Sequence, residues 1–244
     1  MCGRFALTEA LDRLAEHLAL VHPGEFDVEM PPRYNIAPTQ PIFVATNNTM
    51  GQRQGLLVRW GLVPAWVKDP NDFTLLINAR SETAIEKPSF KTAMRHRRIL
   101  IPASGFYEWQ RFGGKRKSQP WWVRPADGGI VAFGGLMETW AGADGTEIDT
   151  ACILSTEANE SFAPIHNRLP LVIPHKDFDR WLDCKTQEPR DVVDIMQPAP
   201  DNYFEAIPVS DAVNKVANGD ASIQQRVEPE EPLPAAPNDQ MSLF

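Results

Sequence analysis

Cys2 has the most distinctive chemistry in this sequence, because only the initiator methionine precedes it. A small second residue permits removal of that methionine, which would leave Cys2 with two nucleophiles on adjacent carbons. The α-amine has a reference pKa of about 7.7–8, so part of it is neutral at pH 7, and the thiol reacts as thiolate. Such a pair can trap an aldehyde, because the amine forms a Schiff base and the thiol then closes a thiazolidine ring. The dipeptide alone is equally compatible with a cysteine that is simply small and apolar.

Five further motifs follow along the chain: RYNIAP at 33–38, WGLVPAW at 60–66, NARSET at 78–83, IPASGFYEW at 101–109 and HNRLP at 166–170. Together with the N-terminal MCGRF, and in this order and spacing, they resemble the SOS response-associated peptidase family, the abasic-site crosslinking proteins of bacteria and eukaryotes. The resemblance extends to about residue 218, where VNKVAN at 213–218 looks like the family's closing motif. Each motif alone is weak, whereas the ordered set is specific.

The resemblance implies covalent capture of abasic sites in single-stranded DNA, since the ring-opened abasic sugar presents an aldehyde. Cys2 would be the nucleophile. Asn78 would hydrogen-bond near Cys2 and the sugar, because an amide donates and accepts without titrating. Glu108 would be the acid/base for ring opening, and its aromatic neighbours would raise its pKa by desolvation. His166 would be the second proton-transfer group, since imidazole titrates near pH 6.5.

Each of these residues also has a plainer interpretation from the sequence alone. An asparagine such as Asn78 commonly caps a turn, and a glutamate such as Glu108 is commonly exposed on a strand. A lone histidine such as His166 is more often a surface residue than a catalytic one. Only the ordered motifs favour the catalytic interpretation over these alternatives.

The resemblance also implies a DNA-binding surface. Arg4 and Arg80 look like phosphate clamps beside the nucleophile, and Arg168 would hold a phosphate or a carboxylate. The alternative for the first two is an internal ion pair, for instance between Arg80 and Glu82 or Glu108. Pro38 and Trp66 would be apolar surfaces against which bases stack or are wedged apart. Where some family members carry a second aromatic residue after that tryptophan, this chain has Val67.

The charge distribution supports a local DNA contact on an acidic protein. The formal net charge is -8, which argues against a general nucleic-acid binder. Residues 87–117 nevertheless carry nine basic and one acidic side chain, net +8: Lys87, Lys91, Arg95, Arg97, Arg98, Arg111, Lys115, Arg116 and Lys117 beside Glu108. We expect this basic segment to follow a single-strand backbone, with Lys91 and Arg98 among the contacts. The alternative is a solvated hairpin and helix surface.

The helices and strands that must position these residues can be predicted from the sequence pattern, and together they indicate an α+β fold. Residues 8–20 show helical spacing of leucines, with Thr8 as a cap, and the prolines of residues 31–41 indicate an ordered loop. Most other segments are short β-rich runs separated by turn residues, and short helices fit residues 88–95, 159–163 and 175–182. We therefore expect one domain over residues 1–227, with a mainly antiparallel, barrel-like β core and short helices.

Residues 228–244 differ from the rest of the chain. They are rich in proline, alanine and acidic residues, so we expect them to be disordered. The chain ends in Gln240, Met241, Ser242, Leu243 and Phe244, which resembles the short peptide by which bacterial repair and replication proteins bind the sliding clamp. The alternative is a hydrophobic terminus without a function.

Further expectations follow from what the sequence lacks. No apolar run reaches the roughly 18 residues of a membrane helix, and no secretory signal is recognisable. The three cysteines, Cys2, Cys152 and Cys184, fit neither a disulfide framework nor a zinc site, which favours a reducing cytosol. The DNA-binding function that the resemblance implies would associate the protein with the nucleoid. The family resemblance implies no metal and no organic cofactor, and a monomer is the simplest assembly.

Three other functions fit part of the pattern. Class II glutamine amidotransferases also begin Met-Cys-Gly, but they carry an Asn-Gly element in mid-chain, and the sole Asn-Gly here is Asn218-Gly219. A thiol peptidase would pair Cys2 with His166. A non-catalytic single-stranded DNA-binding module would use the basic segment alone, and replacement of Cys2 would then leave its function unchanged.

Overall fold

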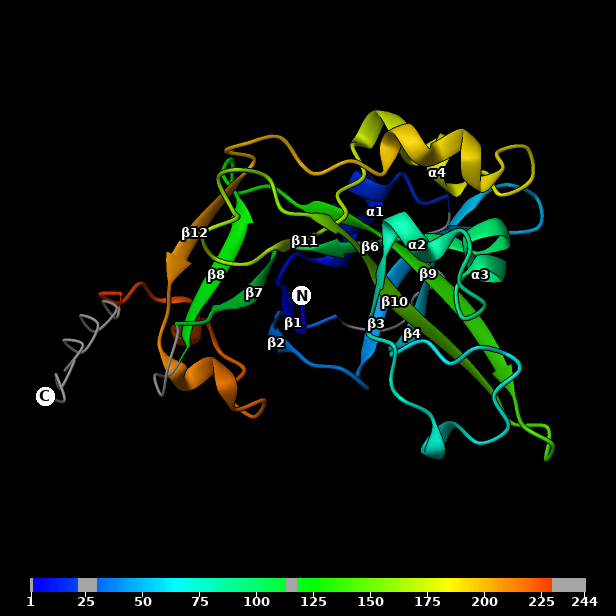
Figure 1. The fold of residues 1–244 in the computed structure, drawn as a ribbon, viewed down its shortest axis with the longest axis horizontal. Helices are drawn as coiled ribbons and strands as arrows, with labels where there is room; N and C mark the ends of the chain where they lie inside the picture. Colours follow the sequence, from blue (N-terminus) through cyan, green and yellow to red (C-terminus); the bar gives the residue numbers. More distant parts are fainter. Residues whose placement is uncertain (1, 22–29, 113–117, 230–244) are drawn as a thin grey trace, which may run out of the picture.

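A computed structural model gives the structure of this chain and describes residues 2–21, 30–112 and 118–229. Its strands form two sheets that lie side by side, with the N-terminal residues between them (Figure 1). The expected α+β class with a mainly antiparallel, barrel-like β core is confirmed. Within the described residues, no helix is long and apolar enough to cross a membrane.

The larger sheet closes on itself as a five-stranded ring. The pairings run from β10 to β4, β3, β6 and β9, and β9 then pairs β10 again. All of these pairs are antiparallel except β10–β4, which is parallel. The sequence did not predict this parallel pair. The strands of the ring are β3 (Pro41–Asn47), β4 (Arg53–Trp60), β6 (Arg98–Ala103), β9 (Val131–Ala141) and β10 (Glu147–Glu157).

Two three-residue strands pair with the end of β10 and so bring distant motifs together. β5 (Asn78–Arg80) runs parallel to β10, with Asn78 opposite Ile153. β11 (Arg168–Pro170) is antiparallel to β10, with Arg168 opposite Glu157. The NARSET and HNRLP motifs therefore lie beside the same strand.

The second sheet is antiparallel and carries the N-terminus. Its strand order is β12-β8-β7-β1-β2, and Arg4 of β1 lies opposite Tyr107 of β7. Continued by one residue toward the N-terminus, this register would place Gly3 opposite Glu108, so that Cys2 follows directly beside it. The bounds are β1 (Arg4–Leu7), β2 (Arg33–Ile36), β7 (Gly105–Gln110), β8 (Gln119–Pro125) and β12 (Phe204–Pro208).

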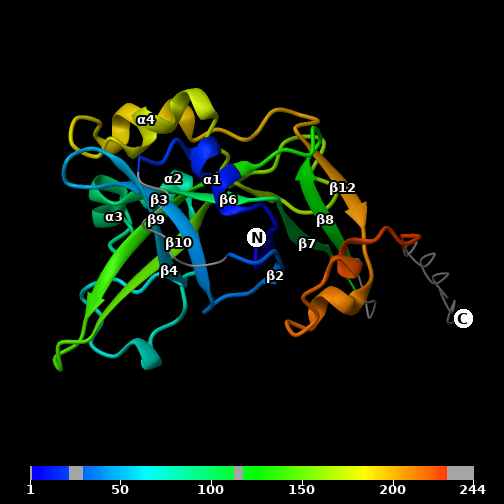
Figure 2. The same ribbon diagram turned by 180° about the vertical axis from the view of Figure 1, so that it is seen from behind.

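The helices are short and cover the outside of the ring, as Figure 2 shows from behind. The α-helices are α1 (Leu11–Leu18), α2 (Ser81–Ala84), α3 (Lys91–His96) and α4 (Phe178–Leu182). The 3₁₀ turns are η2 (Pro70–Asp72), η3 (His175–Asp177), η4 (Pro189–Ile195), η5 (Asp211–Asn214) and η6 (Ala221–Gln224).

Several local predictions need correction. The first helix begins at Leu11 rather than after Thr8, whose backbone N–H and hydroxyl instead bond to the hydroxyl of Ser104. Residues 33–36 of the predicted loop form β2, and residues 159–163 of a predicted helix form turns. The predicted strand at 171–173 is displaced, since the strand β11 ends at Pro170.

A single large apolar cluster joins the two sheets and reaches the N-terminus. Cys2 and Phe5 belong to it, together with Trp60 of the ring. The rings of Phe5 and Trp60 pack edge to face with centroids 5.2 Å apart. Because β1 is packed on both sides, the backbone at Cys2 is held firmly by the core rather than lying free as chain ends usually do.

Candidate functional site

Cys2 is buried at the junction of the two sheets. Its side chain is 2% exposed, and its Sγ donates to the carbonyl of Arg4 at 3.6 Å. The carbonyl oxygen of Cys2 accepts a hydrogen bond of 2.8 Å from the Nδ2 of Asn78. Cys2 and Asn78, which the sequence placed in one site, are therefore in direct contact.

Asn78 offers a second polar atom at this point. Its Nδ2 is used by Cys2, and its Oδ1 is buried with no hydrogen-bond partner among the described residues. A buried acceptor without a partner costs free energy unless something supplies the missing donor. A ligand hydroxyl or amine beside Cys2 would satisfy it. The turn-capping alternative for Asn78 does not hold, because the residue begins β5 and bonds across to the N-terminus.

Glu108 is buried on β7 beside Cys2. It is 4% exposed, so the alternative of an exposed strand glutamate is wrong. Its Oε1 accepts from the backbone N–H of Trp109 at 3.1 Å. Its Oε2 lies 4.0 Å from the Nδ1 of His166. The two predicted proton-transfer groups are therefore neighbours, although they are 58 positions apart in the sequence.

The environment of Cys2 keeps its thiol protonated. Burial, and to a smaller extent the negative charge of the nearby Glu108, raise the pKa of Cys2 to about 12. These values apply to the chain that retains Met1. A thiol peptidase needs a thiolate near neutral pH, so this environment does not favour that alternative.

The imidazole of His166 is bonded to the backbone of a residue close to it in the sequence. The backbone N–H of Arg168 donates to the Nδ1 of His166 at 2.9 Å. A backbone amide can only donate, so Nδ1 must accept, and the proton of the neutral ring is assigned to Nε2. The neutral tautomer is therefore set by a main-chain contact rather than by Glu108.

A cleft of about 520 Å³ opens beside these residues. It is lined by three apolar side chains, by polar residues of the NARSET and HNRLP motifs and by one further arginine: Leu75, Leu76, Ile77, Asn78, Arg80, Arg111, His166, Asn167 and Arg168. Arg80 and Arg111 are exposed at this cleft. Their guanidinium groups suit phosphate oxygens of a strand that enters it.

Two of the predicted phosphate ligands have internal partners. Arg4 donates from Nη1 to the Oδ1 of Asn35 at 2.7 Å and to the carbonyl of Val213 at 2.8 Å, which ties β1 to the closing motif. Arg168 forms two bonds with Glu82, Nη1 to Oε1 at 2.8 Å and Nη2 to Oε2 at 2.9 Å. The sequence predicted that Arg168 holds either a phosphate or a carboxylate. In the structure its partner is a carboxylate, that of Glu82.

Arg98 is not a DNA contact, and that prediction is wrong. Its side chain is fully buried at the start of β6, where it packs beneath α4. Its guanidinium donates to four backbone carbonyls, at distances of 2.7 to 3.0 Å: those of Met94, Trp181, Asp183 and Gln187. A fully buried cation that makes four hydrogen bonds inside the protein stabilises the fold and cannot reach a phosphate.

The rest of the basic segment is divided rather than gathered into one groove. Arg95 pairs with Glu188, and Arg97 lies 3.7 Å from carboxylate oxygens of Glu138 and Asp149. Lys91 is exposed at the start of α3, which packs on β6 and β9 and not on the sheet that carries Cys2. Its contact with DNA stays a prediction. Lys115, Arg116 and Lys117 lie outside the described residues.

The predicted stacking residues are on loops near the ring. Trp66 is 60% exposed and contacts Phe73 edge to face, with centroids 5.6 Å apart. Val67 is buried against Trp140, whose Nε1 donates to the Val67 carbonyl at 2.7 Å. The side chain after Trp66 therefore packs inward. Pro38 is partly buried.

Sequence reasoning missed two polar residues that organise the site. Asn35 donates from Nδ2 to the carbonyls of Val213, Lys215 and Asn218 at 2.7 to 3.3 Å, which fastens the closing motif to β2. Glu82, which pairs with Arg168, was considered only as a partner of Arg80. Asn35 lies in the RYNIAP motif and Glu82 in the NARSET motif. Their places in these motifs could have marked them as important, but a motif does not show which residues they bind.

No three His, Cys, Asp or Glu side chains are gathered as a metal site anywhere in residues 2–21, 30–112 and 118–229. The residues predicted to bind the sliding clamp, Gln240, Met241, Leu243 and Phe244, lie outside the described residues. The predicted disorder of the C-terminal segment concerns mostly residues 230–244, which also lie outside them.

Comparisons with known proteins agree on one family. Residues 1–216 match the family model described as "SOS response associated peptidase (SRAP)". The abasic site processing protein YoaM of Bacillus subtilis is 36% identical over 230 residues, covering 91% of this chain and 97% of that protein. The abasic site processing protein YedK of Escherichia coli is 32% identical over 237 residues, covering 93% and 100%. A crystal structure of a protein from Bacteroides thetaiotaomicron has the same fold, with a TM-score of 0.77 at 22% identity, and covers 93% of this chain and 100% of that one.

Proposed function

The chain belongs to the SOS response associated peptidase (SRAP) family, and we propose on that premise that it captures abasic sites in single-stranded DNA through a covalent bond to Cys2. The relatives named above are called abasic site processing proteins. The observation that carries the proposal is the contact of Asn78 with the Cys2 carbonyl, beside a buried Glu108. Once Met1 is removed, the aminothiol of Cys2 would lie beside the carboxyl group of Glu108, which has the imidazole of His166 4.0 Å away.

The reaction needs Met1 to be removed first, because the Cys2 nitrogen is otherwise an amide and not a nucleophile. The free amine then attacks C1′ of the ring-opened sugar, and loss of one water gives an imine. The thiol adds across the C=N bond: sulfur bonds to C1′, and its proton passes to nitrogen. One water is released overall, and no oxidant or reductant is consumed.

Glu108 and His166 are assigned the proton transfers of this sequence. Opening the sugar requires a proton on the ring oxygen and removal of one from the C1′ hydroxyl. Glu108 is the buried group next to Cys2, so it serves as the acid/base at the reacting carbon. His166, whose Nδ1 lies 4.0 Å from Glu108, lines the cleft and assists as the second group. Neither role needs a metal ion or organic cofactor.

The strand itself is proposed to be held by a few contacts at the cleft. Arg80 and Arg111 bind phosphates at its rim, and the exposed Trp66 supplies a stacking face nearby. Arg4, with one nitrogen bonded internally, completes this set. The protein would act on replicating DNA in the cytoplasm at the nucleoid, where an uncaptured abasic site in a single strand is open to cleavage.

A denaturing gel tests the proposal. The purified, Met1-processed protein is incubated with a single-stranded oligonucleotide that carries one abasic site. We expect a shifted band with this DNA and none with intact DNA or with DNA whose aldehyde has been blocked by methoxyamine. Absence of the band from processed wild-type protein would sink the proposal in favour of a non-catalytic binding module, and an equal band from Cys2→Ala would show that Cys2 is not the nucleophile.

We also propose that residues 240–244 bind the bacterial sliding clamp. The support is in the sequence alone: a glutamine followed by Met241, Leu243 and Phe244, at the end of an acidic segment rich in proline. Such a tether would keep the capture site at the replication fork, where single strands are exposed.

A further inference from the structure

We propose that Thr39 is a further DNA-contacting residue, whose hydroxyl donates to a phosphate of the strand beside the abasic site. The proposal deepens the function proposed above and rests on it for the identity of the ligand. It is carried by a strained turn that contains Pro38, the residue that the sequence indicated as an apolar surface for bases.

Residues 37–40 form a tight turn that joins β2 of the second sheet to β3 of the ring. The N–H of Gln40 donates to the carbonyl of Ala37 at 3.3 Å, and Thr39 has a φ of +75°. A proline in the second position and a left-handed residue in the third are features of a type II turn. The third position normally holds glycine or asparagine, because a side chain with a Cβ is strained there.

A threonine in this conformation destabilises the fold. Among the described non-glycine residues with positive φ, Thr39 is the one with a β-branched side chain. A residue held in such a region lowers the folding equilibrium constant by about five- to 150-fold, so the surrounding contacts must hold it there. Strained residues of this kind occur preferentially at sites that bind a ligand.

Hydrogen bonds on both sides hold the turn in place. The Thr39 N–H donates to the carbonyl of Trp60 at 2.8 Å, and the Trp60 N–H donates to the carbonyl of Gln40 at 2.9 Å. The Oε1 of Gln40 also accepts from the N–H of Ala37 at 3.1 Å and from Nη2 of Arg33 at 2.8 Å. The left-handed backbone of Thr39 is therefore imposed by main-chain bonds and by the side chains of its neighbours.

The side chain of Thr39 does not contribute to these bonds. It is exposed, and its hydroxyl forms no hydrogen bond within residues 2–21, 30–112 and 118–229. Glycine would occupy the same position of the turn without the strain. A hydroxyl on a rigid support beside the ring of Pro38 suits a nucleotide, because the ring can contact a base while the hydroxyl donates to the phosphate.

The turn adjoins the cleft through Trp60. The indole N–H of Trp60 donates to the carbonyl of Ile77 at 3.0 Å, and Ile77 lines the cleft just before β5. Gly61 lies under the side chain of Leu75, which lines the same cleft, since a Cβ on Gly61 would be 2.2 Å from the Cδ1 of Leu75. Thr39 therefore has a fixed position next to the end of the cleft where β5 begins.

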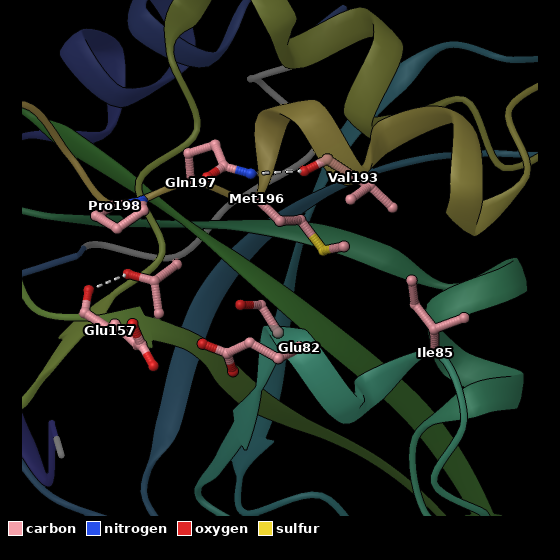
Figure 3. A pocket seen from close by; sticks show the side chains of 9 residues that line it. Glu82, Ile85, Glu157, Val193, Met196, Gln197 and Pro198 are labelled. Carbon is pink, nitrogen blue, oxygen red and sulfur yellow. Dashed lines mark hydrogen bonds between the residues drawn. The ribbon is translucent and has the colours of Figure 1, made fainter.

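The other end of the cleft, where β5 is followed by α2, is less suited to a further phosphate. A second cleft of about 430 Å³ adjoins α2 there (Figure 3). It is lined by Glu82 and Glu157 together with apolar side chains such as Ile85 and Met196. Carboxylates repel phosphate groups, so we expect the additional phosphate contact at Thr39 and not in this second cleft.

Binding to a non-reactive ligand tests the contact. The probe is a single-stranded oligonucleotide with one tetrahydrofuran residue, an abasic analogue without an aldehyde, and fluorescence anisotropy gives its affinity. Thr39→Val keeps the shape of the side chain and lacks the hydroxyl, so we expect about three- to tenfold weaker binding. Thr39→Ser keeps the hydroxyl and should bind as well as the wild type. Thr92→Val removes an exposed hydroxyl from α3 and should leave the affinity unchanged.

The salt dependence of binding distinguishes a hydroxyl from a charged ligand. A hydroxyl releases no counterion, so the slope of log affinity against log salt should be the same in Thr39→Val and in the wild type. Arg80→Gln should instead reduce this slope by about 0.7, the value for one phosphate contact on a single strand.

Thr39→Gly tests the strain without any DNA. We expect a higher midpoint of urea unfolding than in the wild type, because glycine adopts the left-handed conformation without steric cost. The same variant should bind the probe as weakly as Thr39→Val, since both lack the hydroxyl. Circular dichroism checks that each variant is folded.

Two results would overturn the inference. Wild-type affinity in folded Thr39→Val would show that the hydroxyl contacts no phosphate. A lower urea midpoint in Thr39→Gly than in the wild type would show that the turn is not strained. If the wild-type protein forms no crosslink with a natural abasic site, the proposed function fails, and the affinities for the probe still decide whether Thr39 contacts DNA.

Discussion

At the scale of single residues, the main question is which nucleophile of Cys2 reacts first. The thiol is buried and close to Glu108, so its pKa is raised to about 12 in the chain that retains Met1. An α-amine has a much lower reference pKa, about 7.7–8, and is therefore the better nucleophile at neutral pH. This order, amine before thiol, makes the thiol responsible for the stability of the product rather than for its formation.

The variant Cys2→Ala separates the two steps, because it keeps the α-amine after Met1 removal and lacks the thiol. We expect no heat-stable crosslink to abasic DNA from this variant. Addition of borohydride should restore a band, because it reduces the transient imine to a stable amine. The same denaturing gel, run with and without reductant, makes the measurement. A heat-stable band without reductant would contradict the order of steps.

Buried ionisable groups also predict how stability changes with pH. Burial raises the pKa values of Cys2, Cys152 and Tyr107, so all three stay protonated in the folded chain when the unfolded chain has begun to lose those protons. The folded state then binds more protons, and stability must fall as pH rises above the unfolded thiol pKa of about 8.5.

The expected loss is about 1.4 kcal/mol per pH unit for each thiol in this range. Urea unfolding of Met1-retaining protein at pH 8 and pH 10 measures it. Cys152→Ala should show a smaller loss between the two pH values than the wild type, because one buried thiol is removed. An equal loss in both proteins would show that Cys152 is not the group responsible.

At the scale of elements, the sequence predicted the long strands well and the short ones poorly. Apolar runs such as those of β3, β7 and β10 are buried on both faces, so periodicity and turn residues were sufficient to find them. β5 and β11 have three residues each, and they exist because β10 offers them an edge. Nothing local in the sequence encodes such a pairing.

The site shows the same limit. The motifs identified Cys2, Asn78, Glu108 and His166 as a set, and Asn78 does contact Cys2 while Glu108 lies near His166. The sequence could not show which basic residues are exposed to DNA and which are buried. Arg98 looks like its exposed neighbours in sequence, but it is buried because backbone carbonyls from α3 and the segment after α4 converge on it.

Asn35 provides a test at this scale, because one side chain joins three segments. It accepts from Arg4 of β1 and donates to the carbonyls of Val213, Lys215 and Asn218. Replacement by alanine leaves several buried polar groups without partners, at about 1–3 kcal/mol for each such group. We expect Asn35→Ala to lower the unfolding free energy by about 2–4 kcal/mol in total.

Urea unfolding measures this loss, and Asn71→Ala in the exposed turn η2 is the control, which we expect to change stability by less than about 0.5 kcal/mol. Crosslinking by folded Asn35→Ala should also slow, because β1 carries Cys2. Equal stability of the two variants would mean that the closing motif does not depend on Asn35.

At the scale of the whole molecule, the net charge of -8 is compatible with DNA binding only if the contact is small. The +8 segment does not form a continuous groove in the described residues, since Arg95, Arg97 and Arg98 are used internally. What remains at the cleft is a few arginines on an acidic body. Such a protein should bind single strands weakly and depend on the covalent step, rather than on charge, to stay at a lesion.

The proposed clamp binding by residues 240–244 would compensate for weak DNA binding, because a tether raises the effective concentration of the capture site at the fork. We expect deletion of residues 240–244 to abolish binding to the bacterial sliding clamp, measured by calorimetry, and to leave crosslinking of free oligonucleotides unchanged. Replacing both Leu243 and Phe244 with alanine should have the same effect, whereas replacing both Glu230 and Glu231 with alanine keeps the apolar peptide and should retain clamp binding. Equal clamp affinity of the full-length and truncated chains would rule out docking through this peptide, while the capture chemistry at Cys2 would stand unaffected.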